Sequence, residues 1–156
     1  DLGAAPGSWS QVVAKRIGAS GRLIALDLLA IEPIPGATII AGDFAEERVA
    51  AALARALDGR RIDLVLSDMA PNISGIAAAD RARAEALAEL AREFALVHLK
   101  PGGGLVVKVF QSSEADGFVR SLRGRFERIN TRKPEASRDR SSELFVVARG
   151  FAASRS

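Results

Sequence analysis

The sequence predicts an α/β fold in which a mostly parallel β-sheet, with its last strand antiparallel, is covered by helices on both faces. Short apolar runs alternate with longer segments whose apolar residues recur at helical spacing, which favours parallel strands joined by helices. A hydrophobic content of 48% over 156 residues is enough for one sizeable core. Three of the apolar runs end in Asp or just before it, as expected where strand ends form the ligand-binding edge of an open sheet.

The predicted elements follow one another without a linker or an internal repeat. Helices are expected at 8–17, 46–57, 80–99 and 114–122, and strands at 22–27, 37–41, 62–68, 105–110, 126–131 and 143–148. Trp9, Val12, Val13 and Ile17 are expected to share one stripe of the first helix, and Asp58-Gly59 closes the Ala-rich second helix. The third helix ends at the Pro-Gly-Gly-Gly run after Lys100, and its inward stripe is expected to be Leu87, Leu90, Ala91, Phe94 and Val97.

The two ends of the predicted sheet differ. Only the polar loop 132–142 separates the last two strands, so we expect them to pair antiparallel, because parallel neighbours need a longer crossover. Asp1 reads as the end of a strand whose body lies upstream. We therefore expect a single domain over 1–156 that lacks most of its first strand.

The composition excludes several kinds of site. Without Cys, the chain has no disulfide, thiolate metal site or Cys nucleophile, and it fits a reducing cytoplasm. The one histidine, His98, cannot form a His cluster, and no apolar run approaches the roughly 18 residues of a membrane span. We expect a cytoplasmic monomer with no bound metal and no membrane association.

Positive charge is concentrated near the C-terminal end. The formal net charge is +3, but residues 1–118 carry 12 basic and 15 acidic side chains, whereas residues 119–156 carry 10 and 4. Eight of these basic residues fall within 21 positions: Arg120, Arg123, Arg125, Arg128, Arg132, Lys133, Arg138 and Arg140. This distribution favours a polyanionic partner such as RNA. A solubilising Arg-rich surface remains the alternative.

The opening run Asp1–Gln11 has the residues of a ligand-binding turn between a strand and a helix. Gly3 and Gly7 allow close approach of the main chain, and the following helix offers free N–H groups. The G-x-G-x-x-G pattern of dinucleotide sites is absent. A nucleotide-like ligand without a pyrophosphate fits better, and S-adenosylmethionine is the obvious one.

Polar groups with possible chemical roles end or interrupt the later strands. Asp27, Asp43 and Asp68 follow three strands, where a carboxylate can accept ribose hydroxyls or an adenine amine. Each could instead be a turn former or a helix cap. Lys108 lies inside a strand, where its amine needs a partner unless it reaches water, and Glu143 opens the last strand or is simply solvated there. Together these groups suggest a site that handles protons.

The chain resembles the FtsJ/RrmJ-type 2′-O-ribose methyltransferases of large-subunit (23S) ribosomal RNA, the methyltransferase E family. The resemblance spans nearly the whole chain in six stretches in family order: DLGAAPGSWSQ (1–11), DLL (27–29), GDF (42–44), SDMAPNISG (67–75), LKPGGGLVVKVFQ (99–111) and SRDRSSELFVVARG (137–150). Glycine loops like the first occur in many methyltransferases, but the six together are specific. The resemblance implies a Rossmann-like methyltransferase fold.

The resemblance also implies roles for particular residues. Gly7 and Trp9 would bind S-adenosylmethionine, with Asp27 at its ribose, Asp43 near its adenine and Asp68 near its methionine end. Asp68, Lys108 and Glu143 match the last three members of the family's Lys-Asp-Lys-Glu catalytic tetrad. The first Lys would precede Asp1, so we expect the 156-residue chain to bind cofactor but to be nearly inactive as a methyltransferase. Ser8 departs from the second Gly usual in the loop, and it could cap the following helix.

The implied chemistry is physically reasonable. The sulfonium is already a strong electrophile, so positioning of the ribose 2′-hydroxyl and a general base supply the acceleration, and no metal is needed. A lysine acts as a base only when desolvation or a neighbouring cation lowers its pKa, whereas carboxylates favour the ammonium. We therefore expect Asp68 and Glu143 to hold Lys108 and stabilise positive charge. The implied substrate is a uridine of large-subunit RNA, met on an assembled subunit.

The sequence excludes some other functions and leaves others open. The absence of Cys excludes a cytosine-5 methyltransferase, and Met69-Ala70-Pro71-Asn72 lacks the Pro-Pro-aromatic motif of amino-group methyltransferases. A methyltransferase acting on another RNA 2′-hydroxyl, or on a small molecule, fits the same fold. A catalytically silent RNA-binding or ribosome-assembly module is the alternative from another class.

Overall fold

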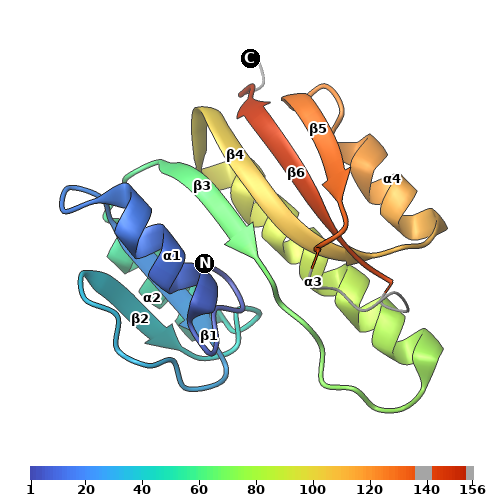
Figure 1. The fold of residues 1–156 in the computed structure, drawn as a ribbon, viewed down its shortest axis with the longest axis horizontal. Helices are drawn as coiled ribbons and strands as arrows, with labels where there is room; N and C mark the ends of the chain where they lie inside the picture. The colour runs from blue at the N-terminus through green and yellow to red at the C-terminus, as the bar shows by residue number, and fades with distance from the viewer. Residues whose placement is uncertain (136–141, 154–156) are drawn as a thin grey trace. The chain divides into compact units, whose positions relative to one another are not determined.

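The computed structural model describes residues 1–135 and 142–153, and it divides into two compact units. The first unit comprises Asp1–Arg60 and the second Arg61–Ser156. Figure 1 labels their helices and strands along the chain. No helix of the described residues is both long enough and apolar enough to cross a membrane.

The first unit is a two-stranded parallel sheet with two helices. Its elements are α1 (Ser8–Ile17), β1 (Leu23–Asp27), β2 (Ala37–Ala41) and α2 (Glu47–Leu57). β1 pairs in parallel with β2, and the opening segment adds a parallel bridge from Leu2 to Leu26. Figure 1 shows α1 in front of this sheet and α2 behind it. Val49 and Leu53 are the buried residues of α2, so its apolar stripe faces the core as the helical spacing requires.

The second unit is a four-stranded sheet with two helices. Its elements are β3 (Ile62–Ser67), α3 (Ala77–His98), β4 (Leu99–Phe110), α4 (Ser113–Leu122), β5 (Phe126–Arg132) and β6 (Glu143–Phe151). The strand order is β3-β4-β6-β5. α3 packs against β4, α4 against β5, and the two helices contact each other (Figure 1).

Strand direction in this sheet follows the prediction. β3 and β4 are parallel, whereas β6 is antiparallel to both β4 and β5. β3, β4 and β5 therefore run one way and only β6, the last strand, runs against them. The expected antiparallel pairing of the last two strands is confirmed. The described strands pair in two groups, β1-β2 in the first unit and β3-β4-β6-β5 in the second.

The inward face of α3 differs from the predicted stripe. Its buried residues are Ala84, Ala88, Ala91 and Ala95, so of the five expected inward residues only Ala91 is buried. Val97 is 61% exposed, and the others are half-buried. The four alanines recur at helical spacing, and their small side chains let the helix lie close to β4. The prediction favoured larger apolar residues and missed this narrower seam.

The boundary between α3 and β4 also differs from the prediction. The strand begins at Leu99, directly after the helix, and includes the glycine run that was expected to be a loop. The pairing register shifts between Ile62 and Leu64, so the extra residues of β4 form a bulge there. At Gly103, a Cβ atom would lie 2.9 Å from the Lys100 carbonyl oxygen and 3.1 Å from that of Asp63. The bulge therefore needs glycine at this position.

Candidate active site

The amine of Lys108 lies between two carboxylates in the second unit. Its Nζ is 3.1 Å from Asp68 Oδ1 and 3.9 Å from Glu143 Oε1, and it donates a hydrogen bond of 3.4 Å to the Asp68 carbonyl. The Lys108 side chain is only 8% exposed, whereas those of Asp68 and Glu143 are 38% and 39% exposed. The structure thus brings together the three residues that the sequence placed in a tetrad. The alternative in which Lys108 extends to water on its own does not occur.

Strand pairing explains why these residues meet. Ser67 pairs with Val107, so Asp68, the next residue after β3, emerges beside Lys108. On the other side, Lys108 pairs with Phe145, and Glu143 is two positions from that partner. Residues two apart on a strand point to the same face, and such diagonal neighbours are within reach of long side chains. Parallel and antiparallel pairing of β4 together create the cluster.

The cluster can hold and stabilise a positive charge. A buried ammonium is costly unless it is paired and hydrogen-bonded, and here two carboxylates and a carbonyl compensate for the lost water. The partly exposed acids leave the cluster open to a polar substrate. An amine held in this way can orient a hydroxyl group.

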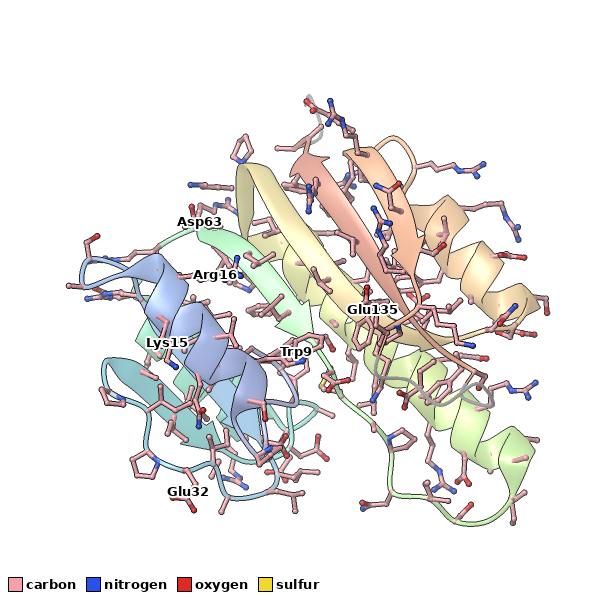
Figure 2. All side chains as sticks on the ribbon, in the orientation of Figure 1. Trp9, Lys15, Arg16, Glu32, Asp63 and Glu135 are labelled. Atoms are coloured by element: carbon pink, nitrogen blue, oxygen red, sulfur yellow. The ribbon has the colours of Figure 1, made fainter. Side chains whose placement is uncertain are left out.

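In the first unit, the loop before α1 has the geometry that the glycines suggested. Gly7 is the residue that caps the helix N-terminus, with φ of 120°, and no side chain caps the first turn. An L-residue rarely adopts this φ, so glycine is required there. Ser8 is the first residue of α1 and does not act as its cap, which corrects that expectation. Figure 2 shows Trp9 at the beginning of α1 and Lys15 and Arg16 further along it.

Asp27 connects this loop to the end of β1. Its Oδ2 accepts the N–H of Ala5 and its Oδ1 accepts the N–H of Leu29, both at 2.9 Å. Each carboxylate oxygen has a second lone pair that can accept a further hydrogen bond. The carboxylate is therefore fixed in orientation and retains capacity for two hydroxyl donors.

Asp43 lies just past the end of β2, at the same edge of the two-stranded sheet as Asp27. Its Oδ1 accepts the N–H of Ala45 at 2.9 Å, which is the local turn bond that Asp commonly makes. The turn-forming interpretation of Asp43 is therefore observed. Its proposed contact with adenine stays a prediction.

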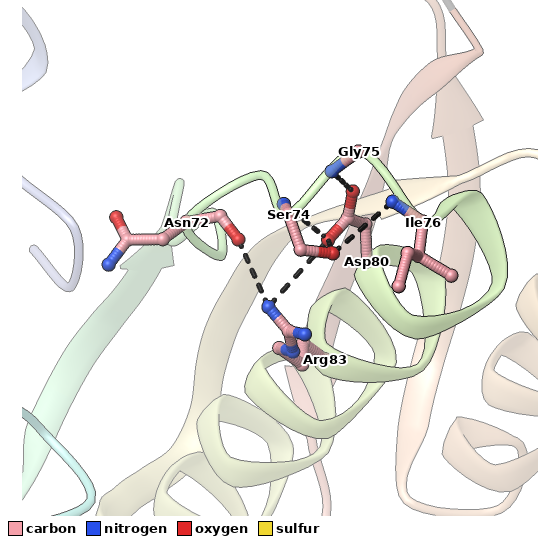
Figure 3. A network of polar contacts seen from close by, with 6 residues as sticks. All are labelled: Asn72, Ser74, Gly75, Ile76, Asp80 and Arg83. Carbon is pink, nitrogen blue, oxygen red and sulfur yellow. Dashed lines mark hydrogen bonds and ion pairs between the residues drawn. The ribbon is translucent and has the colours of Figure 1, made fainter.

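The loop after Asp68 contains a polar network that sequence reasoning missed. Asp80 in the first turn of α3 accepts hydrogen bonds from Ser74 N–H (2.8 Å), Ser74 Oγ (2.7 Å) and Gly75 N–H (3.2 Å), as Figure 3 shows. Arg83 donates to the carbonyl of Asn72 at 3.2 Å. The hydrogen bond from the Ser74 hydroxyl is the main cause that lowers the pKa of Asp80. An acid near a helix start was visible in the sequence, but its loop partners were not.

The described basic residues that are expected to contact RNA lie on α4, in the turn between α4 and β5, on β5 and directly after β5. Arg120, Arg123, Arg128, Arg132 and Lys133 are exposed. Arg125 is half-buried with its guanidinium 5.6 Å from the centre of the Phe151 ring, so it has a packing role. Arg138 and Arg140 lie outside the described residues.

The fold and the site together can be assigned to a class of protein by comparison with known proteins. A helix-flanked parallel sheet with a glycine turn before α1, and a lysine between two acids at strand ends, is the framework of an α/β methyltransferase. The model of the FtsJ-like methyltransferases matches residues 1–151. The chain belongs to this family and is an enzyme.

Individual relatives agree with this assignment. The chain is 53% identical over 150 residues to ribosomal RNA large subunit methyltransferase E of Chromobacterium violaceum, and 55% identical over 154 residues to the protein of that name in Bordetella pertussis. Each alignment covers 96% of this chain and 73% of the relative. A crystal structure of a ribosomal RNA methyltransferase from Plasmodium falciparum is similar with a TM-score of 0.84 and 27% identity, covering 99% of this chain and 86% of the other.

Proposed function

We propose that this enzyme transfers a methyl group from S-adenosylmethionine to the 2′-hydroxyl of a uridine ribose in large-subunit (23S) ribosomal RNA. The observation that carries the proposal is the buried Lys108 amine held by Asp68 and Glu143. The names of the relatives, which refer to the RNA of the large ribosomal subunit, support the substrate. The family match to residues 1–151 supports treatment of both units as one methyltransferase domain.

The residues of the first unit fit the cofactor. The uncapped first turn of α1 after Gly7 offers backbone N–H groups to an anionic group. Asp27 retains acceptor capacity for two ribose hydroxyls, because each of its oxygens accepts one backbone N–H. We assign Gly7, Trp9, Asp27 and Asp43 to cofactor binding, and Asp68 to the methionine end. When bound, S-adenosylmethionine supplies the methyl group as an electrophilic sulfonium.

The residues of the second unit would prepare the hydroxyl. Lys108 Nζ orients the ribose 2′-oxygen, and a neutral amine there accepts the hydroxyl proton as the oxygen attacks. The resulting ammonium is stabilised by Asp68 at 3.1 Å and by Glu143 at 3.9 Å. Because these partners are in place before the reaction, little reorganisation is needed when the charge forms.

The test is a map of ribose methylation in large-subunit RNA by mass spectrometry. Cells whose only copy carries Lys108→Ala should lose methylation at one uridine, because loss of a general base costs roughly 10²–10⁴-fold in rate. Lys100→Ala is a matched control, since Lys100 lies on the same strand and forms an exposed ion pair with Asp63. Full methylation with Lys108→Ala would rule out the proposed role.

The same experiment separates the alternatives. Loss of a methyl group from a different RNA would indicate another 2′-hydroxyl substrate. A wild-type protein that binds ribosomal RNA but no S-adenosylmethionine, and whose deletion leaves every methyl group in place, would be a silent binding or assembly module.

A further inference from the structure

Two isoleucines protrude from the loop that follows Asp68. Ile73 is 86% exposed and Ile76 is 65% exposed. Single exposed apolar residues are common on protein surfaces and need no explanation. Here two exposed isoleucines lie within four residues, on the loop that follows a proposed catalytic acid, five and eight residues along the chain from Asp68.

The loop is held in place by α3. Asp80 binds Ser74 and Gly75, the Ser74 hydroxyl accepts the N–H of Ile76 at 3.3 Å, and Arg83 binds the Asn72 carbonyl (Figure 3). The residues on both sides of Ile73 are therefore fixed to the first turns of a long helix. A side chain presented in this way can pack against a ligand with little loss of conformational entropy.

The surroundings of Ile73 suit a nucleic acid. Arg81 and Arg83 are exposed on the same helix end, where they can meet phosphates. Unpaired bases in RNA usually stack on aromatic side chains. Each of the seven phenylalanines of this chain is buried or half-buried, and the chain has no Tyr. Ile73 is the most exposed of the large hydrophobic side chains among the described residues, and it offers an apolar surface to the face of a base.

We propose that Ile73, presented by the loop 72–76 that Asp80 and Arg83 hold, packs against a base at or next to the methylated nucleotide and so positions the RNA. This inference rests on the proposed function, because it names the contact through which that RNA is held. Asp80 and Arg83 act as positioning residues through the loop, and Ile73 makes the contact.

Steady-state kinetics on large ribosomal subunits that lack the methyl group tests the contact. Ile73→Ala should raise KM for the subunits about tenfold, or about 1.4 kcal/mol, with kcat and cofactor affinity unchanged. Ile73→Val should retain most of the affinity, and Asp80→Asn should raise the same KM because the loop is released. A KM at the wild-type value for Ile73→Ala, or a fall in kcat alone, would overturn the inference.

Val97→Ala is the matched control. Val97 is an exposed aliphatic residue near the other end of the same 22-residue helix, about 30 Å away along its axis. This variant should leave KM for the subunits unchanged. An equal rise in KM for both variants would mean that surface apolarity in general, and not this loop, determines affinity.

Photo-crosslinking identifies the partner directly. The Ile73→benzoylphenylalanine protein should form an adduct with ribosomal RNA within a few nucleotides of the methylated uridine, and Val97→benzoylphenylalanine should not. An adduct with a ribosomal protein alone would overturn the inference and indicate a protein-docking loop. If the full-length wild type fails to methylate, the proposed function is wrong, and the adduct still decides whether Ile73 meets RNA.

Discussion

The Lys108 ammonium is tolerated inside the sheet because its partners come from both neighbouring strands, Asp68 from the end of β3 and Glu143 from β6. Its residue type and strand position made it conspicuous in the sequence, and Asp68 and Glu143 followed from the resemblance. The distances of 3.1 and 3.9 Å depend on strand pairing, which one-dimensional patterns do not contain. Asp80 was visible only as an acid near a helix start, because its partners Ser74 and Gly75 depend on how the loop closes.

Asp27 offers the most direct test of cofactor binding. Asp27→Ala removes a carboxylate that holds Ala5 and Leu29 and is proposed to accept the cofactor ribose. We expect affinity for S-adenosylmethionine, measured by isothermal titration calorimetry, to weaken by about 1–3 kcal/mol for lost charged hydrogen bonds. Asp58→Asn is a control, because Asp58 caps the end of α2 with a left-handed backbone that Asn also tolerates. Unchanged affinity in Asp27→Ala would disprove the ribose assignment.

Helices and strands were predicted well where periodicity was strong and less well where glycine intervened. α1 and β2 have the predicted bounds, because apolar spacing and clear stop signals agree there. β4 begins six residues earlier than expected, because a Pro-Gly-Gly-Gly run looks like a loop even when a bulge pairs it with β3. The seam of buried alanines on α3 was missed because alanine is common both in cores and on surfaces.

The N-terminus of α4 provides a stability test. Ser112 Oγ accepts the N–H of Ala115 at 3.1 Å and so caps the helix. Ser112→Ala should lower the free energy of unfolding by about 1 kcal/mol, measured by urea denaturation. Ser113→Ala is the control, because the Ser113 hydroxyl donates to the exposed carboxylate of the neighbouring Glu114 and does not cap the helix. Equal stability of both variants would mean that the cap contributes nothing.

Charge is distributed over the chain as the sequence implied, but not every basic residue is available to a partner. Arg128 and Arg132 are exposed on β5, which is an edge strand. Charged side chains on an edge strand also prevent pairing with other chains, so their presence has two explanations. Composition alone does not distinguish them, and it also counted Arg125, whose guanidinium lies over Phe151.

The salt dependence of RNA binding separates these explanations. A double variant, Arg128→Ala with Arg132→Ala, should reduce the slope of log K against log salt by about 1.4 if each residue contacts one phosphate of a single strand. Fluorescence anisotropy with a labelled RNA fragment measures this slope. Lys15→Ala with Arg16→Ala removes equal charge from α1 as the control. An unchanged slope, together with aggregation of the β5 double variant, would favour the other explanation, in which these arginines prevent the edge strand from pairing with other chains.

The pairing of β4 with β6 has a further consequence for how the enzyme can fail. Side chains alternate between the two faces of a strand, so a slip of β6 by one residue would turn Glu143 away from Lys108 and bring Leu144 into its place. An apolar neighbour would then replace a counter-charge at the buried amine. Correct alignment of the last strand is thus a precondition for the proposed acid–base chemistry, and we expect a misregistered molecule to be inert even with every residue present.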